Sequence, residues 1–143
     1  MDTVRQIIGE GGQSVHSVAP TDTVLTAAQR MNDHHIGSLV VLDGSKLVGI
    51  VTERDVMRRV VATQRDPMET SVREIMTADV LTCSPKTSIS QAKAVMRDRR
   101  IRHLPVCEHD RLVGIISIGD LNAFENHQLC TTLDMLEAYI SQA

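Results

Sequence analysis

Apolar residues recur along the first part of the chain with two different periods. In residues 15–18 they alternate with polar ones, a pattern typical of a short strand, and Pro20 then marks a turn. From Val24 onward they occupy positions i, i+3, i+4 and i+7, which form the apolar stripe of a helix. We expect this helix to end near His34 or His35.

A hairpin and a second helix follow in the pattern. Two runs rich in leucine and β-branched residues, 36–42 and 46–52, flank the turn dipeptide Asp43-Gly44, which predicts two antiparallel strands. Residues 53–64 return to helical spacing and carry two acidic residues in the first turn, where the helix dipole favours negative charge. Together these patterns predict the element order βαββα.

The same order occurs a second time. A shift of 65 positions places residues 15–55 on residues 80–120 without a gap, and Leu47-Val48-Gly49-Ile50 falls on Leu112-Val113-Gly114-Ile115. Two copies of a unit that is too small to bury its own apolar face should pack together by a pseudo-twofold rotation. We therefore expect an α/β (α+β) fold of two βαββα repeats, with the functional site in the cleft between them.

The repeat divides the chain into four parts. The predicted parts are an N-terminal helix with a glycine-rich linker over 1–14, the two repeats over 15–71 and 72–126, and a C-terminal amphipathic helix over 127–143. The glycines of the linker predict a flexible connection. We expect the C-terminal helix to follow a cap at Thr131-Thr132, and the pattern leaves open whether its apolar stripe packs on this chain or on a second one.

Composition narrows the possible partners. A net charge of −3 offers no basic face for nucleic acid, and one Phe, one Tyr and no Trp leave few rings on which bases could stack. Three cysteines without C-x-x-C spacing favour neither a disulfide framework nor a zinc knuckle, so we expect reduced, packed thiols in a cytoplasmic protein. Because no long apolar run is present, a membrane is not an expected partner either.

A seven-residue motif, G-h-h-[TS]-x-x-D, ends the hairpin in each repeat. Its two copies are Gly49-Ile50-Val51-Thr52-Glu53-Arg54-Asp55 and Gly114-Ile115-Ile116-Ser117-Ile118-Gly119-Asp120, and Arg102-His103-Leu104-Pro105-Val106 supports them. With the surrounding helix and hairpin pattern, the chain resembles a tandem pair of cystathionine β-synthase (CBS) domains. The resemblance implies a paired module that binds adenosine-containing nucleotides in its cleft.

The polar residues of the motif suit a ribose. An ionised carboxylate can accept a hydrogen bond from each of two neighbouring hydroxyls, so Thr52 with Asp55 and Ser117 with Asp120 are two candidate ribose clamps. The alternative is that the hydroxyl residue caps the following helix while the aspartate stabilises its first turn. Both roles are compatible, because a hydroxyl oxygen has two lone pairs.

The resemblance also implies where adenine would lie, between the first strand of a repeat and the start of its hairpin. Adenine needs a flat apolar slot with backbone hydrogen bonds at its edge. The candidate residues are Val15, Ser17, Ile36 and Ser38 in the first repeat and Val80, Thr82, Ile101 and Pro105 in the second. Most of these side chains would serve equally well as core.

Candidate phosphate ligands differ between the repeats. Arg102 and His103 of the second repeat replace Gly37-Ser38 of the first, whereas Arg54 of the first replaces Gly119 of the second. Such cations could converge on shared anionic groups in the cleft, or could simply be solvated surface charges. If His103 contacts phosphate, nucleotide binding should strengthen as pH falls from about 8 to 6.

The sequence offers no catalytic or metal-binding residues. His34 and His35 are adjacent and would point to different sides of a helix, so they cannot chelate one metal together. No serine or cysteine lies in an elbow motif with a base beside it.

We therefore predict a non-catalytic sensor of adenine nucleotides that requires no cofactor. AMP is the first candidate ligand, ATP and ADP are possible, and NAD, an S-adenosylmethionine-type ligand or a purely structural dimerisation scaffold are the alternatives. A homodimer is expected, with an unidentified effector protein as a possible further partner. The apolar surface assigned to the dimer consists of Val56, Met57, Val60, Leu121 and Phe124.

Overall fold

The first repeat folds into a three-stranded sheet covered by helices. A computed structural model describes residues 1–142 of the chain. The elements of the first repeat are β1 (Ser17–Val18), α2 (Val24–His34), β2 (Ser38–Asp43), β3 (Lys46–Thr52), α3 (Glu53–Val56) and the π-helix η1 (Met57–Val61). Strand β1 pairs in parallel with β2, and β2 pairs antiparallel with β3. The hairpin predicted around Asp43-Gly44 is confirmed.

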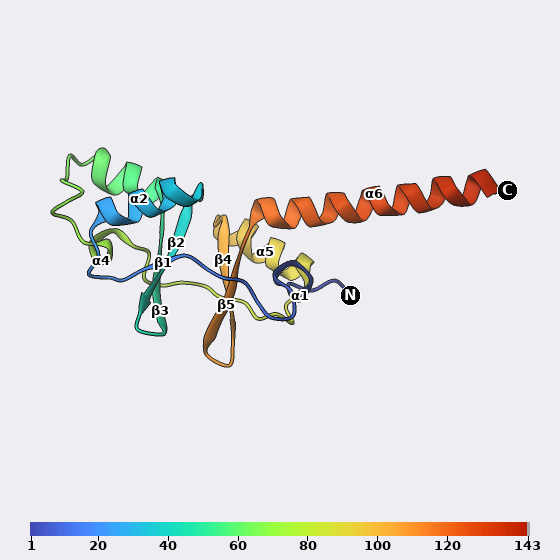
Figure 1. Cartoon of the computed structure of the whole chain (residues 1–143), viewed down its shortest axis with the longest axis horizontal. Helices are drawn as coiled ribbons and strands as arrows, with labels where there is room; N and C mark the ends of the chain where they lie inside the picture. The colour runs from blue at the N-terminus through green and yellow to red at the C-terminus, as the bar shows by residue number, and fades with distance from the viewer. Residues whose placement is uncertain (143) are drawn as a thin grey trace.

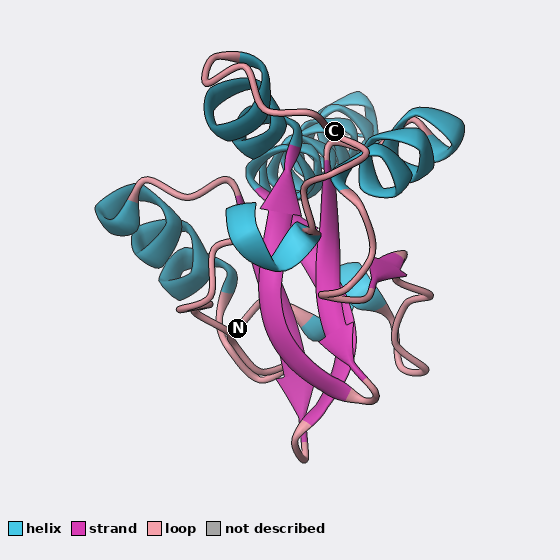
Figure 2. Ribbon diagram, turned by 90° about the vertical axis from the view of Figure 1, so that its left-hand side faces the viewer, coloured by secondary structure: helices cyan, strands magenta, loops and turns pink. Residues whose placement is uncertain are grey.

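The second repeat has the same order of elements with a shorter first strand. Its elements are α5 (Ile89–Arg99), β4 (His103–Glu108), β5 (Arg111–Ser117) and the start of α6 (Ile118–Gln142). The position of β1 is taken by a single parallel bridge between Cys83 and Val106. The two hairpins lie side by side with helices around them (Figure 2). The fold is therefore the predicted α+β pair of repeats.

Helices α2 and α5 begin and end at equivalent residues. Each begins with a side-chain cap, in which the hydroxyl of Thr23 or Ser88 accepts a hydrogen bond from a backbone N–H of the first turn. Each ends with a residue in the left-handed region, His35 at φ 54° and Arg100 at φ 56°. The end predicted for the first helix, near His34 or His35, is confirmed.

Two short helices exchange places between the repeats. Helix α1 (Arg5–Ile8) precedes the first repeat in sequence, yet Val4 and Ile8 are buried in the core of the second repeat. Helix α4 (Val72–Ile75) begins the second repeat in sequence, yet Val72 and Ile75 are buried in the core of the first. Each core is completed by residues from outside the repeat that the sequence delimits.

The two short helices and the segments that follow them leave little room for a side chain at the glycine that opens each motif. A Cβ atom at Gly49 would lie 3.0 Å from the carbonyl oxygen of Thr77, and one at Gly114 would lie 2.9 Å from Ile8 Cγ2. The glycine-rich linker is also held, because Gln13 N–H donates to the Val113 carbonyl over 2.8 Å. A flexible connection was expected at this linker; instead it is fixed against the second hairpin.

The helix predicted over 53–64 changes type after one turn. Beyond α3 the chain continues as η1, in which N–H groups bond carbonyls five residues earlier, as from Ala62 to Met57 over 2.9 Å. The wider turn buries Val60 (1% exposed) and leaves Met57 (55% exposed) facing outward. Because Leu121 is also fully buried, the dimer surface predicted from Val60 and Leu121 is wrong for these two residues.

Helix α6 is continuous through the predicted C-terminal cap. It begins at Ile118, and its C-terminal half projects away from the two repeats (Figure 1). The cap expected at Thr131-Thr132 is wrong, since the Thr132 hydroxyl donates to the Gln128 carbonyl inside the helix over 3.0 Å. Position 143 of the predicted segment lies outside the described residues. None of the described helices is long and apolar enough to span a membrane.

Candidate functional site

One cleft is lined by the motif of the first repeat and the hairpin start of the second. Its volume is about 300 Å³. The residues that line it are Gly37, Ile50, Thr52, Glu53, Arg54, Asp55, Thr77, Arg100, Ile101, Arg102 and His103. The structure thus brings together the first ribose clamp, Arg54 within it, and Arg102 and His103, which lie about 50 residues later in the sequence.

The clamp of the first repeat forms a capping box at the start of α3. Thr52 N–H donates to Asp55 Oδ2 over 2.9 Å, and Asp55 N–H donates to the Thr52 hydroxyl oxygen over 3.2 Å. The second carboxylate oxygen, Oδ1, lies 3.9 Å from Arg59 Nε, and the Asp55 side chain is 15% exposed. The helix-cap role is therefore present.

The second clamp has the same geometry at the start of α6. Ser117 N–H donates to Asp120 Oδ2 over 2.8 Å, and Asp120 N–H donates to the Ser117 hydroxyl oxygen over 3.0 Å. Asp120 is exposed. In both boxes the cap occupies Oδ2, so Oδ1 is the oxygen with the most freedom to accept a hydrogen bond from a ligand.

His103 lies where the two repeats meet. It pairs with Ser117 across the second hairpin and also lines the cleft beside the first clamp. Burial lowers the pKa of His103 below its ordinary value, and the positive charge of Arg102 acts in the same direction. Asp120 and Glu53 oppose the lowering of that pKa without overcoming it. The free protein therefore holds a neutral imidazole at this position at neutral pH.

The charges around the cleft suit an anion with polar hydroxyls. Three arginines, Arg54, Arg100 and Arg102, line it together with the two carboxylates of Glu53 and Asp55. Arginine forms bidentate hydrogen bonds with phosphate, whereas the carboxylates accept from hydroxyl groups. The cleft can therefore hold a phosphate near the second repeat and a diol near the first.

Sequence reasoning missed Arg100 and Thr77. Arg100 is the left-handed residue after α5, and its equivalence to His35 was a detectable signal. Thr77 enters the cleft because its backbone exchanges two hydrogen bonds with Ile50, of 2.9 and 3.0 Å. In the other repeat the side chain of Gln13 substitutes for this backbone, accepting from Ile115 N–H over 3.0 Å. No sequence pattern marks either contact.

The predicted adenine residues do not gather in one place. Ile101 lines the cleft, and Ile36 lines an adjoining hollow of about 400 Å³. Val80 and Thr82 line a third hollow of about 510 Å³ near the hairpin turns. The other four candidates, Val15, Ser17, Ser38 and Pro105, line none of these three hollows.

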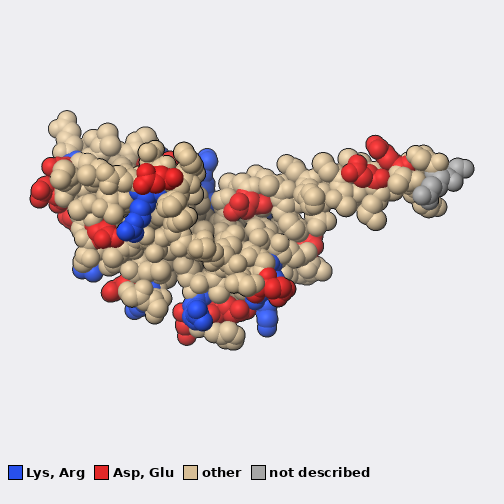
Figure 3. All heavy atoms as spheres, in the orientation of Figure 1, with Lys and Arg blue, Asp and Glu red and all other residues tan. Residues whose placement is uncertain are grey.

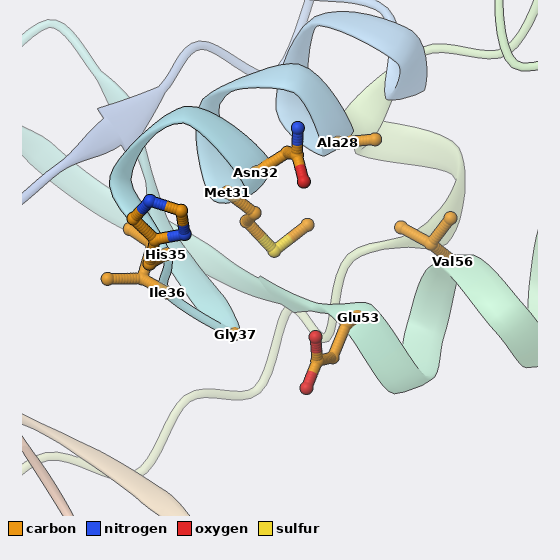
Figure 4. A pocket seen from close by; sticks show the side chains of 8 residues that line it. All are labelled: Ala28, Met31, Asn32, His35, Ile36, Gly37, Glu53 and Val56. Atoms are coloured by element: carbon orange, nitrogen blue, oxygen red, sulfur yellow. The ribbon is translucent and has the colours of Figure 1, made fainter.

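The adjoining hollow lies between the end of α2 and the start of α3 (Figure 4). It shares Gly37 and Glu53 with the cleft, so the two hollows are neighbours. Met31 and Ile36 give it apolar surface, and the imidazole of His35 adds a polar group.

The cysteine and histidine side chains differ in burial and in their neighbours. Burial, together with the neighbouring Cys107, raises the pKa of the Cys83 thiol to about 11, so this thiol is a poor nucleophile. Cys130 is exposed, which contradicts the expectation of packed thiols for that residue. Among residues 1–142 no group of three or more potential ligands could hold a metal ion. The rings of His16 and His34 instead stack at 3.8 Å.

Comparison with known proteins agrees with the repeat structure. The family model for the CBS domain matches twice, over residues 5–62 and 72–125. The chain is 38% identical to the mitochondrial CBS domain-containing protein CBSX3 of Arabidopsis thaliana over 124 residues, covering 83% of this chain and 60% of that protein. It is 36% identical to the CBS domain-containing protein YhcV of Bacillus subtilis over 107 residues, which cover 75% of this chain and 76% of YhcV. The chain thus spans less than two thirds of the length of CBSX3.

Solved structures show the same fold. A Burkholderia ambifaria protein described as a signal-transduction protein with CBS domains matches with a TM-score of 0.79 and 43% identity, covering 83% of this chain and 90% of that one. The CBS domain pair of protein MJ0100, solved with 5′-methylthioadenosine and S-adenosyl-L-methionine, matches with a TM-score of 0.80 and 24% identity, covering 90% and 98%. At 24% identity, the match with MJ0100 shows only that the two chains share a fold.

Proposed function

The chain belongs to the CBS domain family, and on that basis we propose that it is a non-catalytic regulatory module that binds an adenine nucleotide, AMP first, between its two repeats. The observation that carries the proposal is the composition of the 300 Å³ cleft, where the Thr52–Asp55 clamp of one repeat faces Arg102 and His103 of the other. A ligand there touches both repeats at once. It can therefore bias how they sit against each other.

In this proposal each group has a separate role. Asp55 Oδ1 accepts hydrogen bonds from the ribose, while Thr52 and Asp55 Oδ2 keep the helix capped. Arg102 and Arg54 bind the phosphate, and Arg100 adds a third cation at the rim. Adenine lies against Ile101, the one predicted adenine residue that lines this cleft.

Other adenosine compounds are the second candidates. A second hollow borders the cleft at Gly37 and Glu53, and it offers a place for the additional groups of a ligand longer than AMP, such as ADP, ATP, NAD or an S-adenosylmethionine-type compound. The MJ0100 pair, with its bound adenosyl compounds, is a precedent within the fold. An empty dimerisation scaffold predicts no binding of any of these ligands.

Calorimetric titration of AMP, ADP, ATP, NAD, S-adenosylmethionine and adenosine tests the proposal. Asp55→Asn keeps a carbonyl oxygen for the cap but removes the charge that the ribose hydroxyls would meet. We expect it to weaken AMP and adenosine alike, by about ten- to hundredfold, the equivalent of about 1.5 to 3 kcal/mol. Arg102→Ala should weaken AMP far more than adenosine.

The matched control is Arg99→Ala, which removes an exposed arginine of α5 that does not line the cleft. It should leave all affinities unchanged. If none of the six compounds binds, the nucleotide function is wrong. Equal losses of AMP and adenosine affinity in Arg102→Ala would show that Arg102 does not contact the phosphate.

A further inference from the structure

The projecting half of α6 carries a large apolar surface that no other element covers. Every residue from 125 to 141 is exposed, and the last side-chain link to the repeats is the ion pair of Lys93 with Glu125 at 2.7 Å. Six large apolar side chains in this stretch are between 50% and 74% exposed. They are Leu129, Leu133, Met135, Leu136, Tyr139 and Ile140.

Four of the six lie in a regular seam. Leu129, Leu133, Leu136 and Ile140 are separated by four, three and four residues, which is the alternation of the d and a positions in a coiled coil. A helix buried in a broad groove shows a wider apolar face than such a seam. The spacing therefore favours one other helix as the occupant.

The area of the seam can be compared with that of a known dimer interface. At roughly 100 Å² for each side chain, the four seam residues expose about 400 Å², within the range of the largest patch found on a typical monomer. A standard interface buries about 800 Å² from each partner. The seam supplies about half of that area, and residues that flank it, Tyr139 among them, add contact area at its edges.

The charge pattern permits an identical helix as that partner. Residues 126–143 contain no lysine or arginine, and their two acidic residues, Asp134 and Glu137, stand outside the seam. The projecting part is accordingly almost uncharged in Figure 3, with acidic groups only toward its end. The seam is also self-complementary, because an antiparallel copy places Leu129 opposite Ile140 and Leu133 opposite Leu136.

We propose that the projecting half of α6 pairs with the same segment of a second copy of this chain, along the seam of Leu129, Leu133, Leu136 and Ile140. The contact is isologous, so it closes as a twofold dimer and leaves no open end. It does not depend on the nucleotide proposal. The dimer forms with or without a ligand in the cleft.

The mass of the full chain in solution tests this pairing. We expect the combined substitution Leu133→Glu and Leu136→Glu to place unpaired charges in the seam and to raise the dimer dissociation constant at least a hundredfold. Sedimentation velocity at matched concentration should then give half the mass of the unsubstituted protein. The milder pair Leu133→Ala and Leu136→Ala keeps good helix formers and should weaken the dimer less.

The matched control is Thr131→Glu with Ala138→Glu, which adds the same charges on the side of the helix opposite the seam. This variant should keep the mass of the unsubstituted protein. The two repeats should stay folded in all variants, which circular dichroism checks, since every replaced residue lies in the exposed, projecting half of α6. A monomeric unsubstituted protein, or an unchanged mass in the leucine-to-glutamate variant, would overturn the proposal.

Discussion

His103 is the residue whose charge state most directly links the two repeats. It is partly buried between Asp120 of its own repeat and Glu53 of the other, with Arg102 beside it. Burial dominates, so the pKa of the imidazole is lowered from its ordinary value of 6.5. Proton binding at this residue therefore responds to charges from both repeats and to the phosphate proposed to lie nearby.

This lowered pKa moves the pH window that the sequence predicted. A phosphate beside His103 favours the charged imidazole and raises its pKa on binding, so AMP binding should take up a proton. Uptake occurs between the pKa of the free imidazole, which lies below 6.5, and the higher pKa of the bound form, so the lower edge of the window moves below about pH 6.5. Calorimetry of AMP binding in buffers of different ionisation enthalpy measures the uptake, and His103→Gln should abolish it. If AMP bound with no proton uptake anywhere between about pH 5 and about pH 8, the phosphate would not lie beside His103.

At the scale of single residues, the sequence predicted the polar members of the site better than its apolar ones. Thr52, Asp55 and Arg102 lie in one cleft as expected, because a motif or a difference between repeats marked them. The adenine candidates do not lie together in the structure. Apolar residues such as Val80 and Pro105 carry no sequence signal that separates a ligand contact from an ordinary core or linker position. Whether these polar residues bind a nucleotide stays a prediction.

At the scale of elements, α2 and α5 each end in a residue with an unfavourable backbone conformation. His35 and Arg100 adopt φ values of 54° and 56°, a region that costs a residue with a Cβ about 1 to 2 kcal/mol. Glycine avoids this cost, although it loses more conformational entropy on folding. The helices therefore end in an arrangement that glycine would fit better.

His35→Gly should accordingly stabilise the fold by about 0.5 to 1 kcal/mol, the difference between relieved strain and added entropy. His35 lies outside the proposed nucleotide cleft, so AMP affinity should not change. The control, Gln29→Gly at an exposed position inside α2, should instead lose about 0.5 to 1 kcal/mol. Urea denaturation of the two variants measures both changes in the free energy of unfolding. A loss of stability in His35→Gly would show that the imidazole makes a contact worth more than the strain.

Periodicity predicted the elements that follow one regular pattern and failed where the pattern changes. The strands around Asp43-Gly44 and the helix from Val24 have a single period and were correct. The helix after Thr52 switches to π geometry, which rotates Met57 outward, and the sequence contains no signal for that switch. Threonines such as those at 131–132 often cap the start of a helix. Here α6 has already begun at Ile118, so residues 131–132 lie inside the helix and no helix starts there.

The molecule as a whole is held together by exchange of its two short helices. Helix α1 caps the core of the second repeat, where Val4 N–H donates to the Thr87 carbonyl over 2.9 Å. Helix α4 does the same for the first repeat, where Val72 N–H donates to the Asp22 carbonyl over 2.8 Å. The sequence showed the repeat but not this exchange. Each short helix was expected to pack with the repeat next to it in sequence, whereas it packs with the other one.

This exchange couples each clamp to a helix from outside its own repeat. Ile8 packs beside Gly114 at the middle of β5, and that strand ends at the clamp of Ser117 and Asp120. Helix α4 holds β3 in the same way, and that strand ends at Thr52 and Asp55. Loosening one short helix should therefore loosen the clamp at the end of the strand it contacts.

Ile8→Ala and Ile75→Ala test this coupling as a pair, since each replaces the buried last residue of one short helix. Each should destabilise the protein by about 2 to 5 kcal/mol, the usual range for a buried isoleucine cut to alanine. In hydrogen exchange followed by mass spectrometry, Ile8→Ala should expose β5 more than β3, and Ile75→Ala should expose β3 more than β5, because local opening precedes global unfolding. If Ile8→Ala instead exposed β3, its nearer neighbour in sequence, the exchange of helices would not be what holds the repeats together.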